Sequence, residues 1–257
     1  MSNELIKKIK AEFLKSGFPL ELQCRRVLFQ HKWGVTVNKF YTDSEGVEQE
    51  VDCIGHKQTV FSAKGTSHRV LNSMAIIECK KNKANHWVFF GMGGIQRLCM
   101  ASTLNMDQSE YLVSLRGKSL HRHHYLKLEP AGSFSMAFKS KSDKNQIFEA
   151  VNDVLNAYKY GREDTEKNMS KRGSSSGLWI NVYYPTIVFD GKLFFAELVE
   201  DDLELREVDR ILYTMLHPSY LCEWVSIDIV RADVFSNYLD DLDKDHEIIA
   251  SHIKSLK

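Results

Sequence analysis

A carboxylate and an ammonium group stand side by side at the end of an apolar segment. The segment 75–81 reads AIIECKK, and its apolar first half predicts a buried strand. Because alternate residues of a strand share a face, Glu78 and Lys80 point to the same side as Ile76, and Cys79 points to the other side. Solitary charges in an interior strand are costly, so we expect this pair to have a function. Alternatively, it forms a solvated ion pair worth under about 1 kcal/mol.

A second carboxylate group precedes this segment. In EQEVDCIG, residues 48–55, Glu50 and Asp52 share one strand face. If this strand ends beside the segment 75–81, the carboxylates of Asp52 and Glu78 converge. Two carboxylates with a backbone carbonyl between them are ligands that Mg²⁺ prefers, and a lysine next to such an ion can orient or deprotonate an attacking water. Glu50 is either a spare ligand or, as we favour, an exposed carboxylate at a strand edge.

The elements that must position these residues follow from periodicity and turn signals. Expected helices cover residues 3–15, 19–32, 93–104, 145–161 and 232–255. Expected strands cover 35–43, 47–55, 73–81, 110–117, 133–140 and 223–232, and Asp190-Gly191 is expected to turn a hairpin within 180–199. This order predicts an α/β protein with a central mixed β-sheet flanked by helices.

The domain organisation follows from one polar stretch. Residues 161–177 are rich in Gly, Ser and charged side chains, which is typical of a flexible linker or loop. We therefore expect a core in residues 1–160. The C-terminal part, 178–257, is expected to be an α+β extension of hairpin, strand and helix. It is too apolar to stand alone and is expected to pack on the core.

Three segments together resemble the restriction endonuclease-like, PD-(D/E)xK, nuclease superfamily. They are GFPLELQCRRVL, VEQEVDCIG and AIIECKK, and the resemblance covers roughly residues 15–115. Asp52 matches the family's first acid, Glu78 the second acid and Lys80 the lysine, while Glu21 matches a glutamate that many members carry on a preceding helix. Val51 stands where many members have proline, and Gln96 is a weak match to a downstream glutamine.

The resemblance implies a restriction endonuclease-like core and a Mg²⁺- or Mn²⁺-dependent nuclease, with DNA as the expected substrate. Asp52 and Glu78 would hold the ion together with the backbone carbonyl of Cys79. Lys80 would position the water, and Glu21 would support a second ion or the waters of the first. The implied setting is restriction, defence or repair, and cutting both strands with a single site per chain usually requires a homodimer.

Two other functions remain open from the residues. A catalytically silent relative would only bind nucleic acid or a protein partner, although it would have no reason to keep three converging charged groups. Alternatively, the chain is an α/β protein that is not a nuclease, which the failure of Asp52, Glu78 and Lys80 to meet would indicate.

Charge and composition set limits on the partners. The chain has 257 residues, 43% hydrophobic and 26% charged, without an apolar run long enough for a membrane span, so the cytoplasm is the expected compartment and no membrane contact is expected. Residues 1–177 carry 27 Lys and Arg against 18 Asp and Glu, whereas 178–257 carry 7 against 16. A nucleic acid is therefore expected to contact the N-terminal part. The five cysteines show no CxxC pair, and we expect reduced, mostly buried thiols.

Three further motifs are weaker. GSSSG at 173–177 fits a nucleophile motif, but it lies in the expected linker. HRHH at 121–124 either binds a metal ion or forms a solvated loop that could still touch phosphates; we favour the loop, because no carboxylate or cysteine stands at the spacing of a metal ligand. The basic, aromatic stretch 80–87 is either a segment that contacts a nucleic-acid backbone or a plain basic loop.

Overall fold

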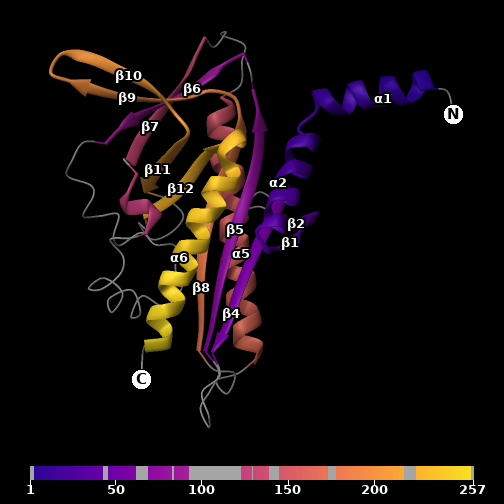
Figure 1. The fold of residues 1–257 in the computed structure, drawn as a ribbon, viewed down its shortest axis with the longest axis vertical. Coiled ribbons are helices and arrows are strands. Elements are labelled where there is room, and N and C mark those ends of the chain that lie inside the picture. Colours follow the sequence, from indigo (N-terminus) through magenta and orange to yellow (C-terminus); the bar gives the residue numbers. More distant parts are fainter. Residues whose placement is uncertain are drawn as a thin grey trace.

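The protein is built on one large mixed β-sheet flanked by helices (Figure 1). The computed structural model describes residues 3–42, 46–61, 69–82, 84–92, 123–128, 130–138, 145–172, 178–216 and 224–255. The described helices are α1 (Asn3–Lys15), α2 (Phe18–Gln30), α5 (Gln146–Arg172) and α6 (Phe235–Ser255), with 3-10 turns η3 (His124–Leu126) and η5 (Ala232–Val234).

The strands before the long helix α5 are β1 (Gly34–Thr36), β2 (Lys39–Thr42), β3 (Glu48–Val51), β4 (Cys53–Phe61), β5 (Arg69–Lys81), β6 (His86–Gly91) and β7 (Pro130–Ala137). Those after it are β8 (Leu178–Asp190), β9 (Leu193–Val199), β10 (Asp202–Val208), β11 (Arg210–Leu216) and β12 (Trp224–Arg231). The large sheet has the order β1-β4-β5-β8-β12-β11-β7-β6-β9-β10, and β2 and β3 form a separate hairpin.

The centre of the sheet is formed by β4, β5, β8 and β12. Strand β5 pairs antiparallel with β4 and parallel with β8, which pairs parallel with β12. Residues 180–189 of β8 are all buried, as expected for a strand that is covered on both faces. Helix α5 covers one face, where it packs on Ile76 and Ile187, and helices α2 and α6 cover the other, where they pack on Ile77 and Val188 (Figure 1).

The predicted linker at 161–177 is wrong over most of its length. Helix α5 continues through residues 161–172, so the expected helix 145–161 ends eleven residues too early. Its polar composition reflects a helix whose side chains are half-buried or exposed at residues 161–168, and Gly161 lies against Ile76 of β5. Residues 173–177, which include GSSSG, lie outside the described residues.

The predicted hairpin within 180–199 is also wrong. Strand β9 does not return beside β8 but pairs with β6 and β10. The ladder between β5 and β8 ends at Lys81 and Asp190, and a ladder between β6 and β9 begins at Trp87 and Leu193. The chain therefore passes from β5 to β6 beside the point where it passes from β8 to β9. Gly191 serves the close approach of two backbones, because a Cβ there would lie 2.4 Å from the Asn82 carbonyl oxygen.

The remaining expectations have mixed outcomes. The expected strands 35–43 and 47–55 are each divided, the first into β1 and β2 and the second into β3 and the start of β4. Gly46, at the expected turn between β2 and β3, has a φ of +81°. The expected helix 93–104 and strand 110–117 fall outside the described residues. Residues 178–257, expected as an extension, supply β8 and β12 at inner positions of the sheet. Helix α1 extends away from the body and has no buried residue (Figure 1). No described helix has the length and apolar character needed to cross a bilayer.

Candidate active site

The β4–β5 register brings Asp52 next to Glu78. The last paired residues are Cys53 and Ile77, so the preceding residue of one strand and the following residue of the other meet where the ladder ends. There the backbone N–H of Cys79 donates to Asp52 Oδ2 at 2.7 Å instead of to a strand carbonyl. Asp52 is thereby fixed to the residue that lies between Glu78 and Lys80.

Lys80 lies between two carboxylates on the α5 side of the sheet. Its Nζ is 2.8 Å from Glu78 Oε1 and 3.1 Å from Asp153 Oδ2 of helix α5. Burial alone would lower the pKa of Lys80, but the charges of Glu78 and Asp153 outweigh burial and raise it. The ammonium therefore stays charged at neutral pH. Asp153 was not among the predicted residues.

The carboxyl of Glu78 is buried against another negative charge. Burial, followed by the charge of Asp52, raises the pKa of Glu78 from its ordinary 4.5 to about 8, although Lys80 acts against both. Burial also raises the pKa of Asp52, against the hydrogen bond from Cys79 and the charge of Lys80. Two neighbouring carboxyls are difficult to ionise at the same time. A bound cation would stabilise their ionised state.

Glu21 reaches the same region from helix α2. Burial and the charge of Asp52 raise its pKa, while Arg25 acts in the opposite direction. Arg25 Nη2 lies 3.2 Å from Glu21 Oε2 and donates to the Asp52 backbone oxygen at 3.0 Å. The arginine, which sequence reasoning missed, therefore fixes both Glu21 and the bend that carries Asp52. Its spacing of four residues from Glu21 is a helical ion-pair signal that the sequence does contain.

The donor set matches the chemistry of a hard divalent cation. Mg²⁺ binds carboxylate and carbonyl oxygens. Because the N–H and C=O of one strand residue point to the same side, the Cys79 carbonyl points toward the end of β4, as its N–H does. Asp52, Glu78 and this carbonyl fit Mg²⁺ or Mn²⁺, and Lys80 supplies a charged hydrogen-bond donor beside them.

Other predicted residues have mixed outcomes. Glu50 is exposed, as expected. The thiols of Cys24, Cys53 and Cys79 are free and buried, as expected, whereas Cys99, Cys222 and Gln96 lie outside the described residues. The expected solvated loop at 121–124 is wrong for its last two residues, His123 and His124. Both are buried, in contact with Asp245 of α6 and Asp228 of β12.

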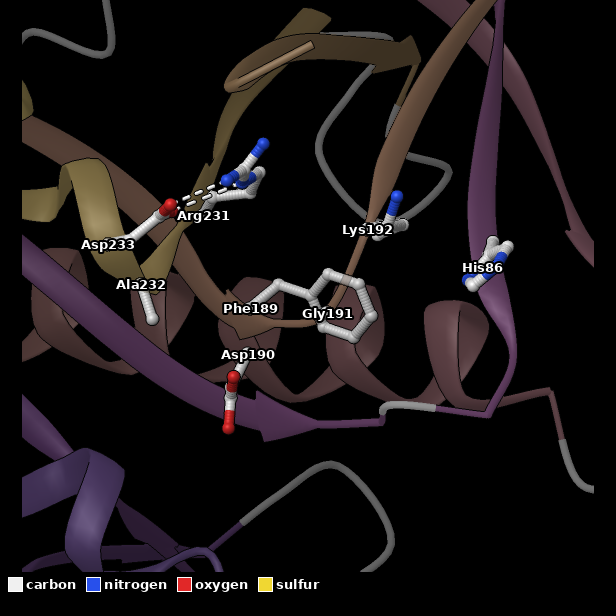
Figure 2. Close-up of a pocket in the computed structure, with 8 residues that line it drawn as sticks. All are labelled: His86, Phe189, Asp190, Gly191, Lys192, Arg231, Ala232 and Asp233. Atoms are coloured by element: carbon white, nitrogen blue, oxygen red, sulfur yellow. Dashed lines mark hydrogen bonds and ion pairs between the residues drawn. The ribbon is translucent and has the colours of Figure 1, made fainter. Parts of the chain in front are cut away.

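A separate pocket lies where β8 and β12 end (Figure 2). It has a volume of about 350 Å³ and is lined by His86, Phe189, Asp190, Gly191, Lys192, Arg231, Ala232 and Asp233. The side chains of Lys192 and Arg231 in this pocket already form ion pairs. Lys192 pairs with Glu207 at 3.1 Å, and Arg231 pairs with Asp209 at 3.2 Å. The pocket contains none of the four predicted catalytic residues.

Comparisons of this chain with known protein families, curated proteins and solved structures found no match.

Proposed function

We propose that this protein is a metal-dependent nuclease with a restriction endonuclease-like core that hydrolyses phosphodiester bonds, with DNA as its expected substrate. One observation carries the proposal. The carboxylate of Asp52 is hydrogen-bonded to the backbone of Cys79, between Glu78 and Lys80. Residues 27 positions apart thus form a cluster of two carboxylates, an ammonium and a carbonyl, which can bind a hard cation and stabilise the charge that develops in phosphodiester hydrolysis.

Each residue has a role in this proposal. Asp52, Glu78 and the Cys79 carbonyl hold Mg²⁺ or Mn²⁺, which when bound stabilises negative charge on the phosphate and lowers the pKa of a bound water. Lys80 orients the attacking water by hydrogen bonding. Its raised pKa supports this role over removal of a proton. Glu21, with Arg25, fixes the Asp52 bend and supports the waters around the ion.

A second reading is a catalytically silent protein of the same fold that binds nucleic acid or a protein partner. The observation in its favour is that Lys80 is already paired with Glu78 and Asp153, as in a structural ion cluster. In that case, removal of the carboxylates would change stability but would leave binding unaffected.

A cleavage assay separates these readings. Purified protein is incubated with plasmid, single-stranded DNA and RNA, with Mg²⁺, Mn²⁺ or EDTA. We expect cleavage only with a divalent ion, and its loss in Asp52→Asn and in Glu78→Gln by at least about 100-fold. Both substitutions keep the side-chain shape, and the amide that replaces the Asp52 carboxylate retains an oxygen to accept the Cys79 hydrogen bond.

The matched control is Glu48→Gln, because Glu48 is an exposed carboxylate on the neighbouring strand β3. It should cleave at the wild-type rate, and all variants should show the wild-type circular dichroism spectrum. Wild-type cleavage by Asp52→Asn or Glu78→Gln would rule out the assignment. Retained salt-sensitive binding without cleavage in the wild type would favour the silent reading.

A further inference from the structure

A buried polar cluster lies on the other face of the sheet, under helix α6. It contains His123 and His124 at the start of η3, Asp228 of β12 and Asp245 of α6, and each side chain is only 2% exposed. Asp228 lies between residues that pack on the α5 side, Ile227 and Ile229, so it points toward α6. The cluster is therefore separated by the sheet from Glu78, which shares the α5 face.

The contacts within the cluster centre on Asp245. Its Oδ2 contacts His124 Nδ1 and lies 3.2 Å from His123 Nε2. Although Asp245 is this close, His123 Nε2 is buried without a hydrogen bond. One nitrogen of each histidine and one carboxylate oxygen of Asp245 all lie within 4.8 Å of one another.

The other nitrogen of His124 is held by the second carboxylate. His124 Nε2 lies 3.1 Å from Asp228 Oδ1, and Tyr238 donates to Asp228 Oδ2 at 2.8 Å. A histidine that binds a metal through one nitrogen nearly always donates its other N–H to a carboxylate, carbonyl or water, and this bond fixes the ring. His124 and Asp228 have this arrangement.

The unpartnered nitrogen of His123 points to a ligand at this cluster. His123 Nε2 is buried and has no hydrogen-bond partner, although it lies 3.2 Å from Asp245 Oδ2. A buried polar atom without a partner is costly. A metal ion bound at Nε2 would supply the missing partner.

We propose that His123 Nε2, His124 Nδ1 and Asp245 bind one transition-metal ion, zinc in the first place, with Asp228 positioning His124. Imidazole nitrogens with a carboxylate suit zinc, whereas Mg²⁺ prefers oxygen ligands. Zinc–ligand bonds of about 2.0–2.2 Å place two ligands of a tetrahedral site about 3.3–3.6 Å apart, so the 3.2 Å between His123 and Asp245 needs only a small adjustment. Metal binding at Nε2 leaves the proton on His123 Nδ1, which then cannot accept a hydrogen bond. The long 3.3 Å hydrogen bond from the Tyr125 N–H to that atom would therefore be lost.

The ion would join three elements that are distant in the sequence. It would hold η3 against α6 and, through His124 and Asp228, against β12. It would stabilise the packing of these elements, and it is independent of the proposed nuclease site on the other face.

The test is the metal content of untagged full-length protein. The protein is produced in zinc-supplemented medium, gel-filtered and assayed by elemental analysis. We expect about one zinc per chain in the wild type and in Glu78→Gln, and its loss in Asp245→Asn. Asp228→Asn should weaken zinc affinity about 10- to 100-fold in a competition with a chromophoric chelator. Retention in Glu78→Gln separates this site from the nuclease site.

The matched control is His246→Gln. His246 is also buried on α6, but its ring nitrogens contact the hydroxyls of Ser73 and Thr59, both at 2.8 Å. This variant should keep its zinc. If the variants fail to fold, reconstitution of the wild type with cobalt still tests the site. Cobalt held by nitrogen and oxygen ligands in a tetrahedral geometry has visible absorption bands. Folded wild-type protein that takes up neither zinc nor cobalt, or Asp245→Asn with full zinc content, would overturn the proposal.

Discussion

The surroundings of Glu78 disfavour the ionised form of its carboxyl. It is buried beside Asp52, and these two causes raise its pKa to about 8. Lys80, the cation paired with it in the described part of the chain, is shared with Asp153. A carboxyl that resists ionisation in the metal-free protein, but has cation-binding geometry, is consistent with a site completed by a divalent ion.

The raised pKa of Glu78 predicts that folding stability depends on pH. Below pH 4.5 the carboxyl of Glu78 is protonated in both the folded and unfolded states, and above about 8 it is ionised in both. Between these values the unfolded state binds fewer protons, so stability falls as pH rises. In EDTA, the free energy of unfolding of the wild type minus that of Glu78→Gln should therefore decline across this window.

Urea titrations at a series of pH values measure this difference, which also subtracts the titrating groups that do not interact with Glu78. Saturating Mg²⁺ should remove most of the decline, because the ion stabilises the ionised carboxylate. A difference that stays constant from pH 4.5 to 8 in EDTA would show that Glu78 ionises normally.

Part of this site could be predicted from the sequence, because it depends on local rules. Strand alternation places Glu78 and Lys80 on one face, and a neighbouring strand end brings Asp52 close. Asp153 could not be predicted, since it depends on how α5 packs against the sheet. The buried histidines were missed for the same reason, because Asp245 lies 121 positions from His124.

Among the secondary-structure elements, the helices were predicted more accurately from periodicity than the pairing of the strands was. The bounds of α1 and α2 follow apolar spacing and the Ser-Gly-Phe-Pro break between them. The hairpin at Asp190-Gly191 was not correct, because a turn dipeptide cannot reveal that the neighbouring strand bends at the same level. The linker was not correct because polar composition is equally typical of an exposed helix.

Two glycines test this account of the elements. Ala at Gly161 would place its Cβ 3.4 Å from Ile76 Cδ1, an ordinary contact, so Gly161→Ala should stabilise α5 by about 0.5–1 kcal/mol. Ala at Gly55 would place its Cβ 2.6 Å from Leu28 Cδ2 of α2, so Gly55→Ala should cost about 1–3 kcal/mol. Urea unfolding measures both. Destabilisation by Gly161→Ala as large as that by Gly55→Ala would contradict a continuous α5.

On the scale of the whole molecule, the two oppositely charged parts of the chain share one sheet. Strand β8, from the acidic part, pairs with β5 of the basic part along 13 residues, from Arg69 with Leu178 to Lys81 with Asp190. Strand β12 then pairs with β8. The charge division in the sequence therefore does not correspond to two structural units.

This arrangement predicts that a chain ending at residue 177 does not fold alone. It lacks β8, which covers one edge of β5, and α6, which covers Ile77 and Cys79. Near-ultraviolet circular dichroism should show no fixed aromatic environment, and co-refolding with the fragment 178–257 should restore it. A cooperatively folded fragment 1–177 would show that the sheet divides into independent parts.

The proposed nuclease requires Asp52 and Glu78 to hold one divalent ion between them. Anomalous diffraction from crystals grown with Mn²⁺ tests it most directly. We predict a manganese peak at about 2.0–2.4 Å from a carboxylate oxygen of each residue, and no peak at this position in Glu78→Gln. Crystals that take up manganese only elsewhere, or that show it bound to one of these carboxylates and not the other, would rule out this metal site.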